Sequence, residues 1–182
     1  MTNFVKEDFQ FGDIITSRSD HFTSKAVRWF MKKANPGQKE TFSHIAVIIN
    51  IWSELWVAEA LGWGLRVWPI EKSDYLKTSQ VLILRDKRGF DYEKEKALSK
   101  KCVSLGGIRY QYENFPQWVV KILLKWNIFK KENEKAIYCS ELGAIAINAA
   151  YPGTFPTPNI TSPADHYLND IYEKIDKNNL LG

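Results

Sequence analysis

The sequence predicts an α+β fold in which an antiparallel sheet packs against a buried helix. Short runs rich in Val, Ile and Trp occur at 44–50, 55–61 and 64–69, separated by only a few residues. Strands joined so closely pair antiparallel, because parallel pairing needs a crossover of about a dozen residues or more. Residues 139–150 (CSELGAIAINAA) are apolar almost all round, which is typical of a helix in the centre of a domain.

Two more strands and a helix are expected in the first half of the chain. Residues 13–16 follow a glycine and read as the first strand, and residues 79–85 form a later one. Between the first two strands, residues 23–34 show apolar side chains at helical spacing, and an Asn-Pro-Gly sequence ends that helix.

Helices dominate the second half. Segments 91–105 and 117–129 each place apolar residues on one face and Lys or Glu on the other, so both are predicted to be amphipathic helices. Residues 151–163 contain four prolines and are expected to run extended over the surface. A last short helix is expected near 165–172.

Composition favours one globular domain. The chain has 182 residues, is 45% hydrophobic and contains seven Trp, so we expect a single domain over 1–182 with its core at about 12–150. The net charge of +4 is mild, and Lys residues are spread among Glu and Asp, which disfavours nucleic acid as a partner. Two cysteines and three histidines show neither a disulfide framework nor zinc-ligand spacing, so neither a metal nor another cofactor is expected.

The chain start and its hydropathy favour a cytoplasmic location. MTNFVKEDFQFGDII has no cationic head followed by an apolar stretch, so no signal peptide is expected. No apolar run reaches the ~20 residues that span a bilayer.

Cys139 and His44 each stand at the start of an apolar element, where a catalytic thiol and imidazole can be brought together. If Cys139 begins its helix, the unpaired N–H groups and the positive end of the helix dipole favour a thiolate. Each residue also has a structural interpretation, as a small buried side chain or as a satisfied histidine at a strand end. That interpretation suits Cys102 better, because Cys102 lies on the apolar face of its helix.

Glu59 is the candidate third member of the site. A hairpin turning around Ile51 and Trp52 would set His44 opposite Glu59, with Cβ atoms about 5 Å apart. Glu59 is the sole charge in LWVAEALGWG, and burying it without a partner would be costly. A register slip of one residue would instead turn Glu59 towards solvent.

Acyl transfer also requires donors for the developing oxyanion. The backbone N–H of Cys139 is one candidate, and the hydroxyl of Tyr110 or Tyr112, in GGIRYQYENF, is a second. Packing in the core or at its rim is the structural alternative for at least one of these tyrosines.

The order of several short motifs resembles that of a known family. They are GDII (12–15), FSHIAVI (42–48), VAEALGWGLRVWPI (57–70), VLILR (81–85), GIRYQYE (107–113) and YCSEL (138–142). This succession resembles the circularly permuted papain-like cysteine hydrolases of the NlpC-type superfamily, and most closely the YiiX-like branch. The motifs gain specificity from their order: papain-like enzymes ordinarily place the cysteine before the histidine, whereas the permuted relatives reverse them, as here.

The resemblance implies a permuted papain-like fold and a role for each site residue. Cys139 would be the nucleophile, His44 the general base and acid, Glu59 the group that orients the imidazole, and Tyr110 the preferred oxyanion donor. The implied activity is a cysteine hydrolase, an amidase or peptidase, that acts on a peptide or acyl-amide through an acyl-enzyme and needs no cofactor.

Two other functions fit the same residues. An acyltransferase, or a lipid-amide or ester hydrolase, would use the same triad, and the Lys- and Trp-bearing segment 117–129 is compatible with an acyl chain or peripheral membrane contact, although burial against the core is favoured. A non-catalytic binding module would keep the fold and leave Cys139 inert.

Overall fold

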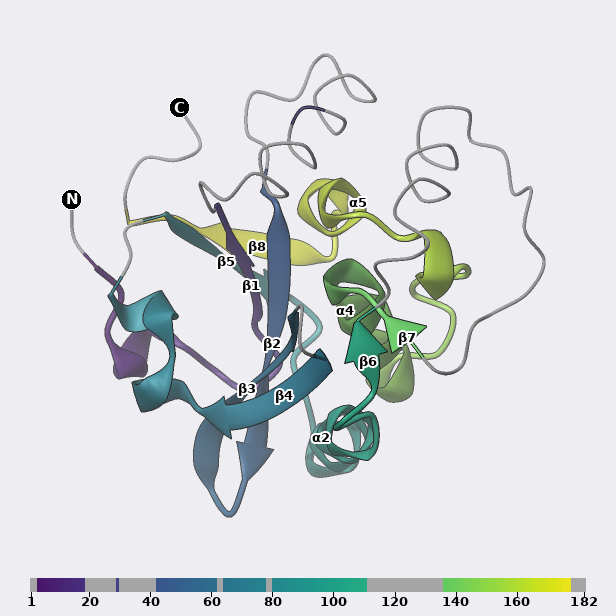
Figure 1. The fold of residues 1–182 in the computed structure, drawn as a ribbon, viewed down its shortest axis with the longest axis horizontal. Coiled ribbons are helices and arrows are strands. Elements are labelled where there is room, and N and C mark those ends of the chain that lie inside the picture. The colour runs from purple at the N-terminus through teal and green to yellow at the C-terminus, as the bar shows by residue number, and fades with distance from the viewer. Residues whose placement is uncertain are drawn as a thin grey trace.

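The computed structural model describes residues 3–18, 29, 42–61, 64–77, 80–110 and 136–177. Its centre is a six-stranded, wholly antiparallel sheet with the order β4-β3-β2-β1-β5-β8 (Figure 1). The strands are β1 (Ile14–Ser17), β2 (His44–Ile51), β3 (Glu54–Leu61), β4 (Gly64–Pro69), β5 (Val81–Asp86) and β8 (Tyr172–Ile175). The mixed α and β class and the antiparallel sheet predicted from the sequence are confirmed.

Three α-helices and a small parallel pair complete the described part of the chain. The helices are α2 (Tyr92–Ser104), α4 (Cys139–Ala150) and α5 (Pro163–Leu168), and the pair is β6 (Arg109–Tyr110) with β7 (Ala136–Ile137). Short 3-10 turns are η1 (Lys6–Asp8), η2 (Ile70–Lys72), η3 (Asp74–Leu76) and η4 (Pro158–Ile160). The helix expected over 117–129 lies outside the described residues. Of the helix expected over 23–34 only Trp29 is described, and its backbone is helical.

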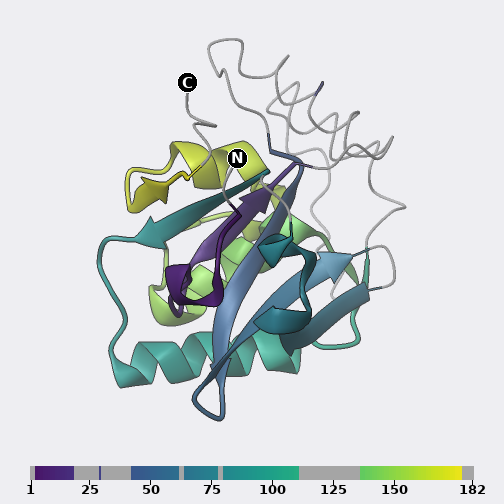
Figure 2. The same ribbon diagram turned by 90° about the vertical axis from the view of Figure 1, so that its left-hand side faces the viewer.

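Both faces of the sheet are covered. Helices α2 and α4 lie on one face, while η1, η2 and η3 lie on the other (Figures 1 and 2). In β2 the side chains of Ile45, Val47 and Ile49 join the core under the helices, and Ala46 and Ile48 join the core on the opposite face. Burial on both faces explains why this strand is a continuous apolar run instead of an alternating one.

The β2–β3 hairpin has a different register from the one predicted. Its turn is centred on Trp52 and Ser53, which both have positive φ (53° and 64°), and Glu59 pairs with Ala46. A two-residue turn of this kind favours Asn and Gly, so Trp and Ser give little sign of it in the sequence. The pairing is shifted by two residues, and because side chains alternate with a period of two, His44 and Glu59 stay on the same face.

The connection from β4 to β5 also differs from expectation. We expected consecutive strands to be neighbours, yet β1 lies between β2 and β5, so β5 is separated from β4 by three strands. Residues 70–77, which include η2 and η3, cross the sheet face opposite α4. The sequence contains no long helical crossover here, and short 3-10 turns carry the chain across instead.

The C-terminal region contains an unpredicted strand. Helix α5 starts at Pro163, earlier than expected, because Ser162 and Asp165 form a capping box and proline suits the first helical position. The helix ends at Leu168, so the expected extent of 165–172 is wrong. Tyr172 instead begins β8, which buries Tyr172 and exposes Glu173 and Lys174 beside β5. Four residues with two charges carry too little hydrophobic pattern to be recognised as a strand.

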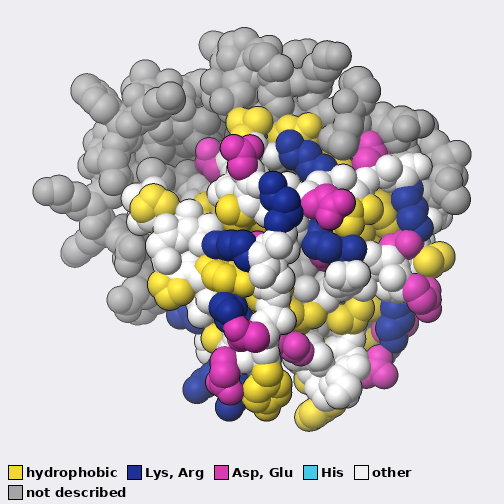
Figure 3. Space-filling model, turned by 180° about the vertical axis from the view of Figure 1, so that it is seen from behind, with side chains coloured by type: hydrophobic (Ala, Val, Ile, Leu, Met, Phe, Trp, Pro, Cys, Tyr) yellow, Lys and Arg dark blue, Asp and Glu magenta, His cyan; other side chains and the backbone are white. Residues whose placement is uncertain are grey.

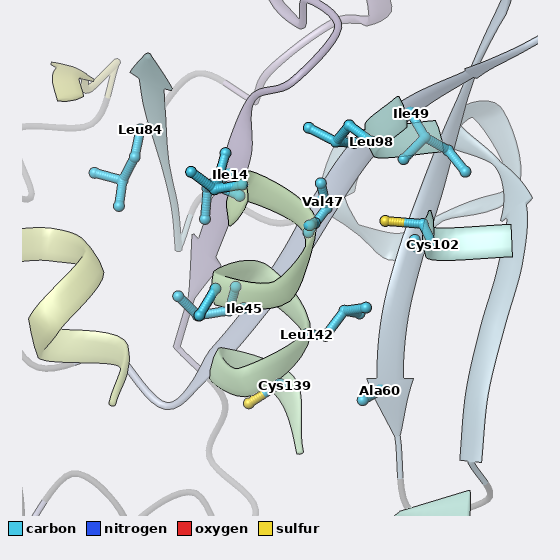
Figure 4. Packing of buried hydrophobic residues seen from close by; sticks show 14 of the residues in the cluster. Ile14, Ile45, Val47, Ile49, Ala60, Leu84, Leu98, Cys102, Cys139 and Leu142 are labelled. Carbon is cyan, nitrogen blue, oxygen red and sulfur yellow. The ribbon is translucent and has the colours of Figure 1, made fainter. Parts of the chain in front are cut away.

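Helix α4 begins at Cys139, as the sequence predicted. Figure 4 shows Cys139 at the N-terminal end of α4, with Leu142 one turn further on and Ile45 of β2 beside the helix. Cys102 projects from α2 into the core and is fully buried, in agreement with its predicted structural role (Figure 4).

The described surface mixes charges of both signs. On the face seen in Figure 3, Lys and Arg side chains alternate with Asp and Glu and with apolar patches. None of the helices in the ranges given above has the length and apolar character needed to cross a bilayer.

Candidate active site

The Cys139 thiol meets the His44 imidazole where the start of α4 approaches the start of β2. Interactions with the imidazole and with the backbone N–H groups of Ile45 and Ser140 lower the pKa of the thiol. Cys139 is the first residue of α4, so the positive end of the helix dipole adds to these donors. All of these interactions favour a thiolate.

Glu59 occupies the other side of the imidazole. His44 Nε2 lies 3.2 Å from Glu59 Oε2, which leaves Nδ1 as the nitrogen that faces the thiol. Glu59 is only 3% exposed. The predicted juxtaposition of His44 and Glu59 on adjacent strands and one sheet face is confirmed, although the residues are diagonal neighbours. Diagonal pairs are about 7–8 Å apart at Cα, and two long side chains bridge that distance.

The electrostatics favour an imidazolium–thiolate pair. Burial alone would lower the pKa of His44, but hydrogen bonds and charge interactions with Cys139 and Glu59 outweigh it and raise this pKa to about 10. Burial would raise the pKa of the Cys139 thiol, whereas the hydrogen bond and charge of His44 lower it below its ordinary value. Cys102 has no such partner, and burial raises its pKa to about 12. The Cys139 thiol is therefore more acidic than an ordinary cysteine, and the Cys102 thiol is less acidic.

Two further residues contact Glu59 that the sequence reasoning did not identify. The Tyr75 hydroxyl donates to Glu59 Oε2 at 2.6 Å, and Arg66 Nη2 lies 3.6 Å from Glu59 Oε1. Arg66 stands directly opposite Glu59 on β4, so its position follows from strand pairing. Tyr75 lies in the crossing segment of residues 70–77, and no spacing in WPIEKSDYLKTS indicates that its side chain contacts the sheet.

Of the two candidate oxyanion tyrosines, only the backbone of Tyr110 is described. It pairs with Ile137 in the β6–β7 ladder, two residues before Cys139. The chain at Tyr110 therefore passes close to the start of α4. Its side chain and the whole of Tyr112 lie outside the described residues, so their roles stay predictions.

His166 supports the first turn of α4 through a contact with Ser140. Its Nε2 lies 2.9 Å from the Ser140 carbonyl oxygen and therefore carries the proton, while Nδ1 lies 3.4 Å from the Tyr172 hydroxyl. Complete burial lowers the pKa of His166 to about 4, so its ring is neutral near pH 7. The contact next to Cys139 gives His166 a structural role in placing the nucleophile.

The fold and the site together define an α+β protein with a cysteine, a histidine and a glutamate aligned at one end of its sheet. A solved structure with the same fold is that of metalloprotein yiiX from Escherichia coli O157:H7, DUF1105, with a TM-score of 0.66. The two sequences are 17% identical over 92% of this chain and 97% of that one. At this identity the likeness concerns the fold alone. No protein-family model matches the sequence, and no curated protein matches it.

The described side chains do not form a metal centre. No three His, Cys, Asp or Glu side chains in this part of the chain converge on a point that could hold an ion. Cys139, His44 and Glu59 instead form a row with the imidazole between the other two, and each ring nitrogen faces a different neighbour. This arrangement suits proton transfer better than metal ligation.

Proposed function

We propose that the protein is a cysteine hydrolase of permuted papain-like type that cleaves an amide through an acyl-enzyme on Cys139. The observation that carries the proposal is the buried row of thiol, imidazole and carboxylate, in which His44 and Cys139 favour the imidazolium–thiolate state. A purely structural cysteine needs neither a charged partner nor a lowered pKa. The YiiX-like fold and the order of histidine before cysteine support the same assignment.

In the first half of the reaction, the Cys139 thiolate attacks the carbonyl carbon of the substrate and forms a tetrahedral intermediate. The N–H of Cys139 has no intrahelical acceptor at the start of α4 and is the proposed oxyanion donor, assisted by Tyr110. The His44 imidazolium then donates its proton to the leaving nitrogen, the C–N bond breaks, and a thioester and a free amine result.

In the second half, water attacks the thioester carbonyl while the neutral His44 imidazole accepts a proton from the water. The C–S bond then breaks, the acid is released, and the thiolate and imidazolium are restored. Glu59 accepts the Nε2–H bond throughout and keeps Nδ1 directed at the thiol, without itself transferring a proton.

Acylation by p-nitrophenyl acetate provides the first test. We expect p-nitrophenol release with acetylation of the peptide that contains Cys139, followed by release of acetate. His44→Ala should lower the acylation rate by about 10²–10⁴-fold, the range typical of a lost general acid-base. Cys139→Ala should form no adduct, and Cys102→Ala should behave as wild type because Cys102 is buried in the core.

Two outcomes would contradict the proposal. One is acylation of Cys139 no faster than that of a free cysteine peptide, which would favour the binding-module alternative. The other is equal reactivity in wild type and His44→Ala. Adding glycinamide as an amine acceptor separates hydrolysis from acyl transfer, because a transferase would yield acetylglycinamide in preference to acetate.

A further inference from the structure

Tyr75 reaches the site from η3, in the connection between β4 and β5. The segment of residues 70–77 crosses the sheet face opposite α4 and packs against it through Ile70 and Tyr75. Tyr75 is 7% exposed, and its hydroxyl lies 2.6 Å from Glu59 Oε2. Figure 2 shows this crossing segment in front of the sheet.

The hydroxyl satisfies a carboxylate that would otherwise be short of donors. Glu59 Oε2 accepts both the Tyr75 hydroxyl and His44 Nε2. Among the described residues, the charged group nearest Oε1 is Arg66 Nη2, at 3.6 Å, too long for a hydrogen bond. A buried carboxylate with a single donor is costly to keep ionised. Burial raises the pKa of Glu59, and His44, Tyr75 and Arg66 together lower it below its ordinary value.

Tyr75 is suited to act as a donor at every working pH. Burial, and the negative charge of Glu59, raise the pKa of the Tyr75 phenol well above its ordinary value, so the hydroxyl keeps its proton. The hydroxyl also bonds the same carboxylate oxygen, Oε2, that His44 Nε2 contacts. Oε2 is thereby held where the Nε2–H bond can form.

We propose that Tyr75 is a positioning residue for the Cys139–His44 pair and acts through Glu59. The inference rests on the proposed function, since it assigns Tyr75 to the hydrolytic site. A tyrosine that only filled the core would contribute its ring, and its hydroxyl could be removed without altering the chemistry of the thiol. A hydroxyl bonded to the same oxygen as the imidazole connects Tyr75 to that chemistry.

The test is the pH dependence of Cys139 alkylation by iodoacetamide in wild type and Tyr75→Phe. Removing the hydroxyl destabilises the Glu59 carboxylate, so the acid midpoint of the alkylation profile should rise by about one pH unit, the equivalent of one hydrogen bond to a charged group. Turnover of p-nitrophenyl acetate near neutral pH should fall about tenfold, mostly in kcat. Tyr151→Phe removes a hydroxyl that donates to the Gly89 carbonyl, away from the site, and should leave the midpoint unchanged.

A double-mutant cycle separates positioning from packing. If Tyr75 acts through Glu59, Tyr75→Phe should have no further effect on the midpoint in a Glu59→Gln background. Site-specific 3-fluorotyrosine in place of Tyr75 keeps the ring and makes the hydroxyl a stronger donor, so its midpoint should move to lower pH. This second variant tests the proposal even if the phenylalanine variant does not fold.

The outcomes distinguish this inference from the proposed function. A wild-type Cys139 that alkylates like an ordinary exposed cysteine overturns both. An activated Cys139 whose profile is the same with Tyr75, phenylalanine and 3-fluorotyrosine overturns the role of Tyr75 alone. Additive effects of Tyr75→Phe and Glu59→Gln would likewise show that Tyr75 does not act through the carboxylate.

Discussion

Gly143→Ala is a sharp test of how closely α4 approaches its support. A Cβ at position 143 would lie 2.9 Å from His166 Cε1, 3.1 Å from His166 Nε2 and 3.2 Å from Ile45 Cγ2. The imidazole cannot move away easily, because it is fully buried, bonded to the Ser140 carbonyl and packed on Phe155 with ring centroids 4.5 Å apart. Either the His166 ring or the backbone of α4 around residue 143 must therefore shift.

The net effect follows from two opposing contributions. Replacing glycine by alanine inside a helix normally stabilises by about 1 kcal/mol. Overpacking a tight core costs about 1–3 kcal/mol. Because the contact is below 3 Å and involves a confined ring, the overpacking cost should lie in the upper part of its range, at about 2–3 kcal/mol. After subtraction of the helix gain, we expect the free energy of unfolding to fall by about 1–2 kcal/mol. For a chain of this length that lowers Tm by about 2–8 °C.

Thermal unfolding followed by circular dichroism measures the effect, and iodoacetamide labelling of Cys139 shows whether the displaced turn also slows the thiol. In a His166→Ala background the ring is gone, so Gly143→Ala should become stabilising. If Gly143→Ala instead raised Tm of the otherwise unchanged protein by about 2–4 °C, as at an unhindered helical position, the close approach between α4 and His166 would be refuted.

Three other outcomes are expected. Glu59→Gln should fold and retain part of its esterase activity, because an amide oxygen can still accept the hydrogen bond from the imidazole N–H. Cys139→Ala should be inactive. If both variants were folded and equally inactive, Glu59 would have to do more than orient the imidazole. Since the pKa of His166 is about 4 in the folded protein and about 6.5 when unfolded, the unfolded state binds more protons between these values, and about 3 kcal/mol of stability should be lost as pH falls from 6.5 to 4. Denaturant titrations at several pH values would measure the free energy of unfolding. This loss between pH 6.5 and 4 should be present in wild type and absent in His166→Gln. Asp13→Ala should cost about 1.5–3 kcal/mol, because it removes the charge-assisted hydrogen bonds between the buried Asp13 carboxylate and Arg85, one of them at 2.8 Å. Arg85 stays partly exposed and keeps its bond to the Asp8 carbonyl, which limits the loss, and a cost below about 0.5 kcal/mol would contradict this.

Strand alternation was the most informative feature of the sequence for the site. The predicted turn at Ile51 and Trp52 was wrong, and the pairing of His44 was off by two residues. An even shift preserves the face on which each side chain lies, so His44 and Glu59 still meet. Apolar character alone likewise predicted both the burial of α4 and its start at Cys139.

Features that depend on tertiary contacts could not be predicted in this way. Tyr75 reaches Glu59 only because the crossing segment lies across the sheet, and neither its composition nor its spacing encodes that path. The insertion of β1 between β2 and β5 is a matter of topology, for which strand spacing is a poor guide. His166 lies in a short helix, and its contact with Ser140 depends on the packing of α5 against α4.

The separation of the site residues along the chain has a consequence for biosynthesis. His44 and Glu59 belong to one hairpin that can form early from local contacts, whereas the thiol arrives only with α4, 80 residues after Glu59. The elements η4 and α5, which pack against α4, are made later still. The last strand to be made is β8, which forms the edge of the sheet beside β5. Under the proposed function, the Cys139 thiol lacks the contacts that lower its pKa until α4 has been made and packed, so its sulfur should become a strong nucleophile only after that point in synthesis. This order would protect neighbouring nascent chains and cellular thioesters from a prematurely reactive sulfur.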